Sequence, residues 1–182
     1  MKKNKITYDI FIRYILLFLF ALGNLYIFYF LLKPLTIYAS YFLFNISYGA
    51  VLLPPEIILV ANTFQIKLIN PCIAGSAYYL LLILNLSTPQ IKFNKRLMLL
   101  LTSFLALFIL NLFRIYFLGI LFFENFYFFD LAHKFFWYFL SVFFVIGIWF
   151  SQVKIFKIKQ VPFYSDIKVI YKNSLFNKKC SH

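Results

Sequence analysis

Few residues in this 182-residue chain can do chemistry, because most of its length is apolar. Three ionisable side chains stand within or at the edge of apolar stretches: Cys72, Arg114 and His133. Such groups are costly in a nonpolar environment and often mark functional sites. A thiol can act as a nucleophile, a guanidinium can stabilise a thiolate or an oxyanion, and an imidazole can transfer protons near neutral pH. The three residues therefore form a candidate catalytic set.

Each of these residues also has a simpler interpretation. A cysteine in an apolar helix is often only packed there. An arginine near a helix end can extend its charge to lipid headgroups, and a histidine at a helix start can lie at the membrane interface. Asp130, three residues before His133, is either the N-cap of the last helix or a partner that orients the imidazole.

The composition indicates which elements must position these residues. Hydrophobic residues make up 64% of the chain and charged residues 13%, which excludes both an ordinary soluble domain and a disordered chain. We expect an all-α polytopic membrane protein with about four transmembrane helices. Their predicted ranges are 10–32, 71–86, 97–120 and 131–150. Five glycines in the whole chain exclude a glycine-rich nucleotide-binding loop.

A further apolar stretch, 35–53, is ambiguous. It has prolines at both ends and several polar residues, so it could span, which would give five to six helical segments, or lie re-entrant or in the interface. After it, residues 56–60 and 64–69 are β-branched runs around the polar turn 61–63, which predicts a small β-hairpin.

The positive charges predict the topology. With four spans and both termini in the cytoplasm, 14 of the 18 lysines and arginines lie on the cytoplasmic side. Segment 34–70 is then extracytoplasmic, with 35–53 re-entrant or interfacial. This distribution assigns the net charge of +13 to membrane topology and excludes a nucleic-acid partner. We expect one transmembrane domain over 1–151 and a basic cytoplasmic tail over 152–182.

The predicted helices place the three candidate residues at one depth. At 1.5 Å per residue, Cys72, Arg114 and His133 lie about 24, 26 and 27 Å from the cytoplasmic ends of their helices. Asn70 and Pro71 are typical of a helix N-cap and first position, so Cys72 is expected in the first turn, where the helix dipole favours a thiolate. The common plane is close to the outer surface.

Three segments resemble the exosortase/archaeosortase family of polytopic membrane enzymes: 69–76 around Cys72, 111–115 around Arg114, and 130–134 around His133. The resemblance extends over roughly 56–150 and is greatest to compact archaeal, pacearchaeosortase-like members. Glycine follows the cysteine by three residues here, whereas many members have it closer. The resemblance implies that Cys72 is the nucleophile, Arg114 the thiolate or oxyanion stabiliser, and His133 the general acid/base.

The resemblance also implies a function. We expect a membrane cysteine protease or transpeptidase that cleaves a C-terminal sorting signal of secreted surface proteins at the outer face, with a lipid as an acceptor in the transfer reaction. Its partners would be membrane-anchored substrates with a C-terminal sorting helix, and no metal or other cofactor is expected. The alternative is a non-enzymatic transporter subunit or assembly factor in which Arg114 binds an anionic group.

Overall fold

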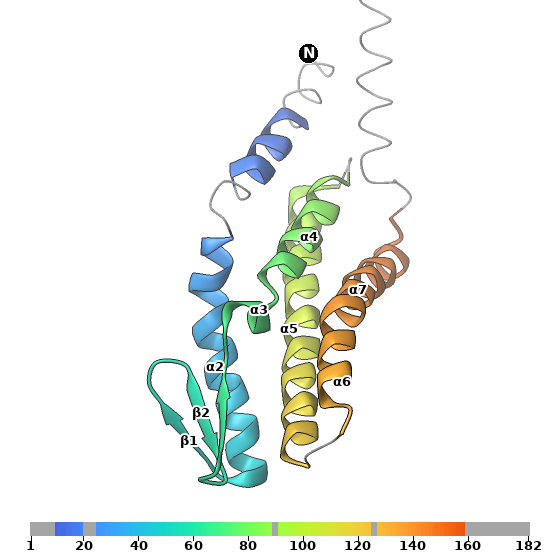
Figure 1. The fold of residues 1–182 in the computed structure, drawn as a ribbon. Helices are drawn as coiled ribbons and strands as arrows, with labels where there is room; N and C mark the ends of the chain where they lie inside the picture. Colours follow the sequence, from blue (N-terminus) through green and yellow to red (C-terminus); the bar gives the residue numbers. More distant parts are fainter. Residues whose placement is uncertain (1–9, 20–24, 89–90, 125–126, 159–182) are drawn as a thin grey trace, which may run out of the picture.

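The computed structural model describes residues 10–19, 25–88, 91–124 and 127–158, and the fold is mostly helical with one small sheet (Figure 1). Three helical stretches are long and apolar enough to cross a membrane. They are α2 (Tyr26–Tyr48), α5 (Phe93–Phe123) and the continuous run of α6 (Phe129–Phe135), η1 (Phe136–Leu140) and α7 (Ser141–Ile155). These helices indicate a membrane protein, in agreement with the coarse prediction.

The outer surface of the bundle is apolar, as this class of protein requires. On α5, Leu101, Leu105 and Ile109 recur every four residues and are each more than half exposed. Polar residues of the same helix, including Ser103 and Asn111, lie on the buried face instead. Side chains that lipid can cover therefore face outward, and hydrogen-bonding side chains face inward.

Two of the four predicted spans are not confirmed as single helices of spanning length in the described residues. The stretch 10–32 is divided between a helix at Ile10–Leu19 and the first part of α2. The stretch 71–86 is divided between the single turn α3 (Asn70–Ile73) and α4 (Gly75–Leu86), because Ala74 has a left-handed backbone with φ of 58°. Neither stretch forms one helix of spanning length, since the hydrophobicity of a run does not reveal such a break.

The interpretation of 35–53 as a re-entrant or interfacial segment is not confirmed either, and the structure agrees better with the alternative of a longer helix. Residues 35–48 form the second half of α2, which contains Pro34 in its interior. Burial of Ile37 and Phe44 on one face stabilises the helix beyond the proline, and Thr36 donates its hydroxyl to the carbonyl of Leu32 at 2.8 Å. The helix ends at Gly49, whose φ is 63°, and residues 50–53 form a strand.

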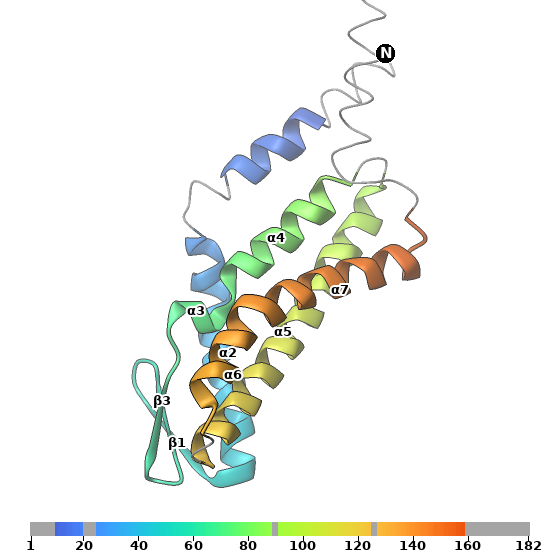
Figure 2. The ribbon, with the colours of Figure 1, turned by 45° about the vertical axis from the view of Figure 1, so that its right-hand side comes forward.

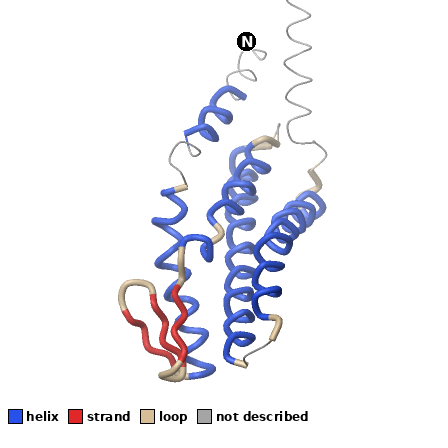
Figure 3. The backbone as a smooth tube through the Cα atoms, viewed as in Figure 1, coloured by secondary structure: helices blue, strands red, loops and turns tan. Residues whose placement is uncertain are grey.

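The predicted hairpin is confirmed and belongs to a larger sheet. Strands β1 (Ala50–Leu53), β2 (Ile57–Val60) and β3 (Phe64–Lys67) form an antiparallel meander in the order β1-β2-β3 (Figure 3). Ala61 and Asn62 have positive φ values in the turn between β2 and β3, the geometry of a tight hairpin turn. Ile58 and Val60 are fully buried and belong to the same cluster as Phe44 of α2. The sheet is thereby fixed on α2.

The sheet and α4 lie toward opposite ends of the bundle. In Figures 1 and 2, α4 lies beside the first half of α5, whereas the sheet lies beside the second half of α2, at the opposite end of the molecule. We call the first of these ends the basic end, because it carries Lys92, Lys95, Arg96 and Lys154. The other is the sheet end. The turn α3 lies between α4 and the sheet.

Hydrogen bonds between buried side chains join the helices near the basic end. Asn85 of α4 donates to Ser103 of α5 at 2.9 Å, and Ser103 donates to Gln152 of α7 at 2.9 Å. The amide of Gln152 then donates to the carbonyl of Leu99 at 2.7 Å. The helix α7 passes the predicted domain boundary at 151, and most of the predicted tail, residues 159–182, lies outside the described residues.

Two helical glycines offer a matched test of packing at the sheet end. A Cβ on Gly119 of α5 would stand 2.5 Å from Cζ of the fully buried Phe44, whereas a Cβ on Gly147 of α7 would meet nothing within 4 Å. We expect Gly119→Ala to lower the free energy of unfolding by ~1–3 kcal/mol through overpacking. Gly147→Ala should leave it unchanged or raise it by up to about 1 kcal/mol, the helix-propensity gain.

Unfolding by sodium dodecyl sulfate in mixed micelles, followed by circular dichroism, measures both variants. Equal stability of the two would contradict the close approach of α5 to Phe44.

Candidate functional site

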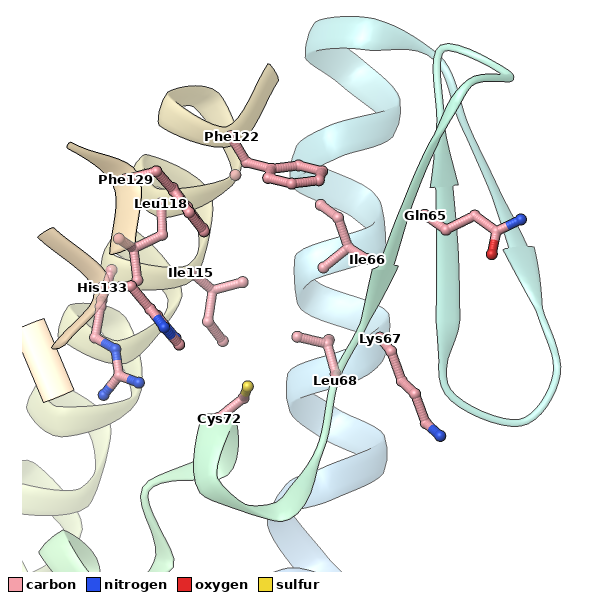
Figure 4. A pocket seen from close by; sticks show the side chains of 12 residues that line it. Gln65, Ile66, Lys67, Leu68, Cys72, Ile115, Leu118, Phe122, Phe129 and His133 are labelled. Carbon is pink, nitrogen blue, oxygen red and sulfur yellow. The ribbon is translucent and has the colours of Figure 1, made fainter. Parts of the chain in front are cut away.

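One cavity of about 230 Å³ brings the three candidate residues together. It lies between β3 and the helices α5 and α6 (Figure 4). Its lining consists of Gln65, Ile66, Lys67, Leu68, Cys72, Arg114, Ile115, Leu118, Gly119, Phe122, Phe129 and His133. Residues from three separate parts of the sequence therefore surround one space.

Cys72 enters this cavity from the turn α3. Its sulfur points into the space between Leu68 and the helices, and the side chain is half-buried (Figure 4). The N-cap is Ile69 rather than the predicted Asn70, and no side chain caps the turn. Because α3 has only four residues, the full-length helix dipole expected at Cys72 is absent from this local structure. A charge that stabilises a thiolate at Cys72 must therefore come from another element.

Asn111 fixes the backbone of Cys72. Its side-chain amide donates to the carbonyl of Cys72 at 2.8 Å, and the side chain is only 3% exposed. Asn111 precedes Arg114 by three residues, so the two lie on the same buried face of α5. The role of Asn111 was not predicted, although an amide one turn before a buried arginine in an apolar helix is a usable signal.

This bond predicts a change in the reactivity of the thiol. In a Cys180→Ser background, we expect Asn111→Leu to increase the rate of Cys72 modification by a membrane-impermeant thiol reagent about fivefold. The factor corresponds to the ~1 kcal/mol that a buried hydrogen bond contributes against local opening. The rate of modification at fixed pH is the measurement.

Asn85→Leu is the matched control, because it removes another buried asparagine bond, to Ser103, far from Cys72. An equal acceleration in both variants would show general loosening rather than positioning of Cys72 by Asn111.

Arg114 is the buried cation of the cavity, with 4% of its surface exposed. Its Nη1 donates to the hydroxyl of Ser141 at 3.1 Å, and Ser141 in turn donates to the carbonyl of Phe136 at 3.3 Å. The Nε of Arg114 has no hydrogen-bond partner among the described residues. An ionised Cys72 would be attracted electrostatically to this guanidinium. Arg114 is thus held on one side and unpaired on another.

Ser141 was missed at the sequence level. It follows the π-helical turn η1, and it lies inside the predicted span 131–150, where it could be taken for an ordinary small residue. The wider turn of a π-helix leaves carbonyls of the preceding turn available for such bonds, and π-turns recur at functional sites. A serine in an apolar span was the available signal.

His133 is held between aromatic rings of its own helical stretch. Its ring is nearly parallel to that of Phe129, with centroids 5.8 Å apart, and it meets Trp137 edge-on at 6.0 Å. The side chain is half-buried and points into the cavity (Figure 4). These contacts orient the imidazole without a carboxylate.

Asp130 fills neither of its two predicted roles. The N-cap of α6 is Phe128, and Asp130 lies exposed in the first turn. Within the described residues, no hydrogen bond joins it to His133. The carboxylate was misplaced because α6 begins two residues earlier than the sequence indicated.

The strand β3 forms the wall of the cavity opposite the helices. Ile66 and Leu68 point into the space, and Gln65 and Lys67 point away from it (Figure 4). The end of the strand is held by a bond from the backbone N–H of Leu68 to the carbonyl of Glu56 at 3.0 Å. Glu56 also forms an ion pair with Lys33 of α2. These contacts fix the strand, and β3 is an edge of the sheet.

In the part of the chain that is described, no group of three or more His, Cys, Asp or Glu side chains is placed to hold a metal ion. Comparison with protein-family models, with curated proteins and with solved structures finds no match to this chain. The chemistry of the cavity itself is therefore the basis for a functional inference. A thiol, a guanidinium and an imidazole around one space supply a nucleophile, a charge stabiliser and a proton carrier.

Proposed function

We propose that this protein is a membrane cysteine protease or transpeptidase that cleaves C-terminal sorting signals of secreted surface proteins, as its resemblance to exosortases and archaeosortases implies. The observation that carries the proposal is the shared cavity of Cys72, Arg114 and His133. The fold brings together the three separate segments that carry the resemblance. If the resemblance were accidental, the three segments would have no reason to meet at one cavity.

The charges support an orientation with the sheet end outside. Lys92, Lys95 and Arg96 lie at the basic end, which the positive-inside tendency places in the cytoplasm. Arg114 follows Arg96 by 18 residues of continuous helix, or about 27 Å, close to the ~30 Å thickness of the hydrocarbon core. The cavity then lies at the outer boundary of the hydrocarbon, where an emerging substrate helix would present its cleavage site.

The reaction begins with attack of the Cys72 thiolate on a substrate carbonyl carbon. The new C–S bond moves an electron pair onto the carbonyl oxygen, and the guanidinium of Arg114 stabilises this oxyanion. As the oxyanion collapses, the C–N bond breaks and the protonated His133 donates its proton to the leaving amine. The product is a thioester on Cys72 and a free sorting helix.

The second step resolves the thioester. Water, or the amine of a lipid acceptor, attacks the thioester carbonyl while neutral His133 accepts a proton from the attacking group. The thiolate of Cys72 then leaves, and the enzyme returns to its initial protonation state. Hydrolysis and transfer differ only in the nucleophile.

The edge of β3 is suited to hold the substrate during these steps. Its free backbone edge can accept an extended peptide by strand addition, which presents alternate side chains to a pocket. Ile66 and Leu68 would contact the side chains that face the cavity. An extended peptide there runs past the sulfur of Cys72.

The test is detection of the thioester. The full chain is coexpressed with a secreted reporter that carries a C-terminal motif, apolar helix and basic cluster taken from a surface protein of the same genome. We expect a covalent reporter adduct on Cys72 that hydroxylamine releases, together with a shortened reporter. Cleavage of such reporters without any adduct, and with Cys72 dispensable, would overturn the proposal.

The alternative of a transporter subunit or assembly factor depends on a different observation. Arg114 is buried with its Nε unpaired, which suits binding of an anion without any reaction. In that case Cys72 only packs, and no reporter would be processed. The adduct experiment therefore separates the two functions.

A further inference from the structure

A second cavity, of about 260 Å³, lies on the other side of Arg114, between α4 and the junction of η1 with α7. Its lining consists of Pro71, Ala74, Ser76, Ala77, Leu80, Arg114, Trp137, Tyr138, Ser141, Val142 and Val145. It contains neither Cys72 nor His133, so the proposed reaction does not use it. Ser141, the hydrogen-bond partner of Arg114, belongs to this second cavity and not to the first.

The charge of Arg114 is not balanced by a carboxylate. Neither of the two cavities that Arg114 lines has an aspartate or glutamate in its wall. Arg114 is 4% exposed, and its Nε has no hydrogen-bond partner among the described residues. A buried, incompletely paired charge is costly, which favours binding of an anion beside it. In the proposed reaction Cys72 becomes neutral as a thioester, so a separate anion would keep Arg114 paired throughout.

Other groups around this cavity favour the same ligand. The break at Ala74 makes Gly75 the first residue of the 12-residue α4, so the positive end of its dipole lies beside Ala74 and Ser76 in the wall. The side chains of Ser76 and Tyr138 supply hydroxyl donors, while the Ser141 hydroxyl already donates to the carbonyl of Phe136. The left-handed residue Ala74 and the π-helical turn η1 thus place several hydrogen-bond donors around one cavity.

The rim of the cavity faces the lipid side of the bundle. Leu80, Trp137, Tyr138 and Val142 are all exposed on the outer surface of the helices. Tryptophan and tyrosine are enriched where a membrane protein meets the headgroup region. Arg114 stands about 27 Å along α5 from Arg96, a separation that matches the distance between the two headgroup layers.

We propose that this second cavity binds the phosphodiester headgroup of a membrane phospholipid, with Arg114, Ser76 and the start of α4 as its donors. The inference goes beyond the proposed function, because it requires no reaction at Cys72. The acyl chains would lie along Leu80 and Val142, outside the bundle. A free phosphate has the same donors available but gains nothing from this apolar rim.

Trp137 provides a reporter inside the site. The chain has two tryptophans, so Trp149→Phe leaves Trp137 as the single tryptophan, which is excited selectively at a wavelength where tyrosine does not absorb. The full chain with Trp149→Phe and Cys72→Ala is purified in a maltoside detergent and titrated with dihexanoyl phosphatidylglycerol below its micellar concentration. Dihexanoyl glycerol and inorganic phosphate are titrated in parallel. We expect a saturable change of Trp137 fluorescence with the phospholipid, at a Kd at least 10-fold lower than with either of the other two ligands.

Ser76→Glu places a carboxylate in the cavity while keeping Arg114, and Ser76→Gln is its neutral control. Ser76 is exposed, so both side chains can be accommodated. We expect Ser76→Glu to weaken phospholipid binding at least 10-fold and Ser76→Gln to retain it. Ser151→Ala, on α7 and in a different cavity, should have no effect.

Three outcomes would overturn the inference. Equal binding of dihexanoyl glycerol would show an apolar groove, equal binding of inorganic phosphate would show a free-anion site, and no saturable response would show no site. Because the protein carries Cys72→Ala, none of these results depends on the proposed reaction. A failure here leaves the thioester experiment unaffected, and the reverse also holds.

Discussion

Replacement of Cys72 by alanine is expected to lower the rate of reporter cleavage by at least ~1,000-fold, because the proposed intermediate is a thioester and Cys72 is the cysteine of the cavity. Serine at this position should lose activity to a similar extent, since its hydroxyl is far less acidic than a thiol and is not ionised near neutral pH. The measurement is the fraction of shortened reporter against time in membranes that contain equal amounts of each variant.

Cys180→Ser is the matched control, because it removes the other cysteine of the chain and should leave the rate unchanged. The two cysteine variants also serve as controls for the thiol-reagent experiment on Asn111→Leu, because each leaves only one cysteine that the reagent can modify. Reporter cleavage by Cys72→Ala at the wild-type rate would exclude a thiol mechanism and favour an anion-binding role for Arg114.

The second large effect is expected at Arg114. Arg114→Lys keeps a positive charge but loses the planar fork that reaches Ser141 and the cavity at once, so we expect a ~100–1,000-fold loss of cleavage rate. The loss should be in kcat more than in KM, because the oxyanion that Arg114 is proposed to stabilise exists only in the transition state and the intermediate.

Ser141→Ala gives the graded comparison. It leaves the guanidinium in place and removes only the contact that orients it, so a loss of about 10-fold is expected. Retention of the helical circular dichroism signal is required of both variants. Full activity of a folded Arg114→Lys protein would contradict the role of the guanidinium in catalysis.

The sequence predicted the contents of the site better than the path of the chain. Cys72, Arg114 and His133 could be recognised because ionisable side chains are rare in apolar runs, and their depths could be estimated from the helical rise alone. The estimate of a common plane did not require the sheet, and the shared cavity agrees with it. Their chemical roles remain predictions that the proposed experiments test.

The positions of the helix breaks could not be predicted in this way. Pro34 suggested the end of a helix, yet it lies inside α2, because buried contacts farther along hold the helix together. Ala74 carries no sequence signal of a left-handed backbone, since glycine and asparagine are the usual residues there. Strand β1 could not be predicted either. It forms by pairing with β2, and the hydrophobicity of one segment does not indicate a contact with another.

The partners of the site were the least predictable part. Asn111 and Ser141 act through hydrogen bonds to Cys72 and Arg114 that cross from one element to another. Residue type suggests that such side chains need a partner, but only the packing of α5 against α3 and α7 identifies it. The misassignment of Asp130 has the same origin, because a helix start two residues earlier moves the carboxylate from the cap into the exposed first turn.

The break at Ala74 separates the thiol mechanically from the helix that follows it. Bilayers of different thickness tilt helices to relieve hydrophobic mismatch, and α4 packs on its neighbours through the buried Tyr78 and through the bond from Asn85 to Ser103. The turn that carries Cys72 is instead tied to α5 by Asn111 and to the sheet through Leu68. A tilt of α4 can thus be taken up by rotation at Ala74. The distance between the sulfur of Cys72 and the guanidinium of Arg114 then does not change with membrane thickness.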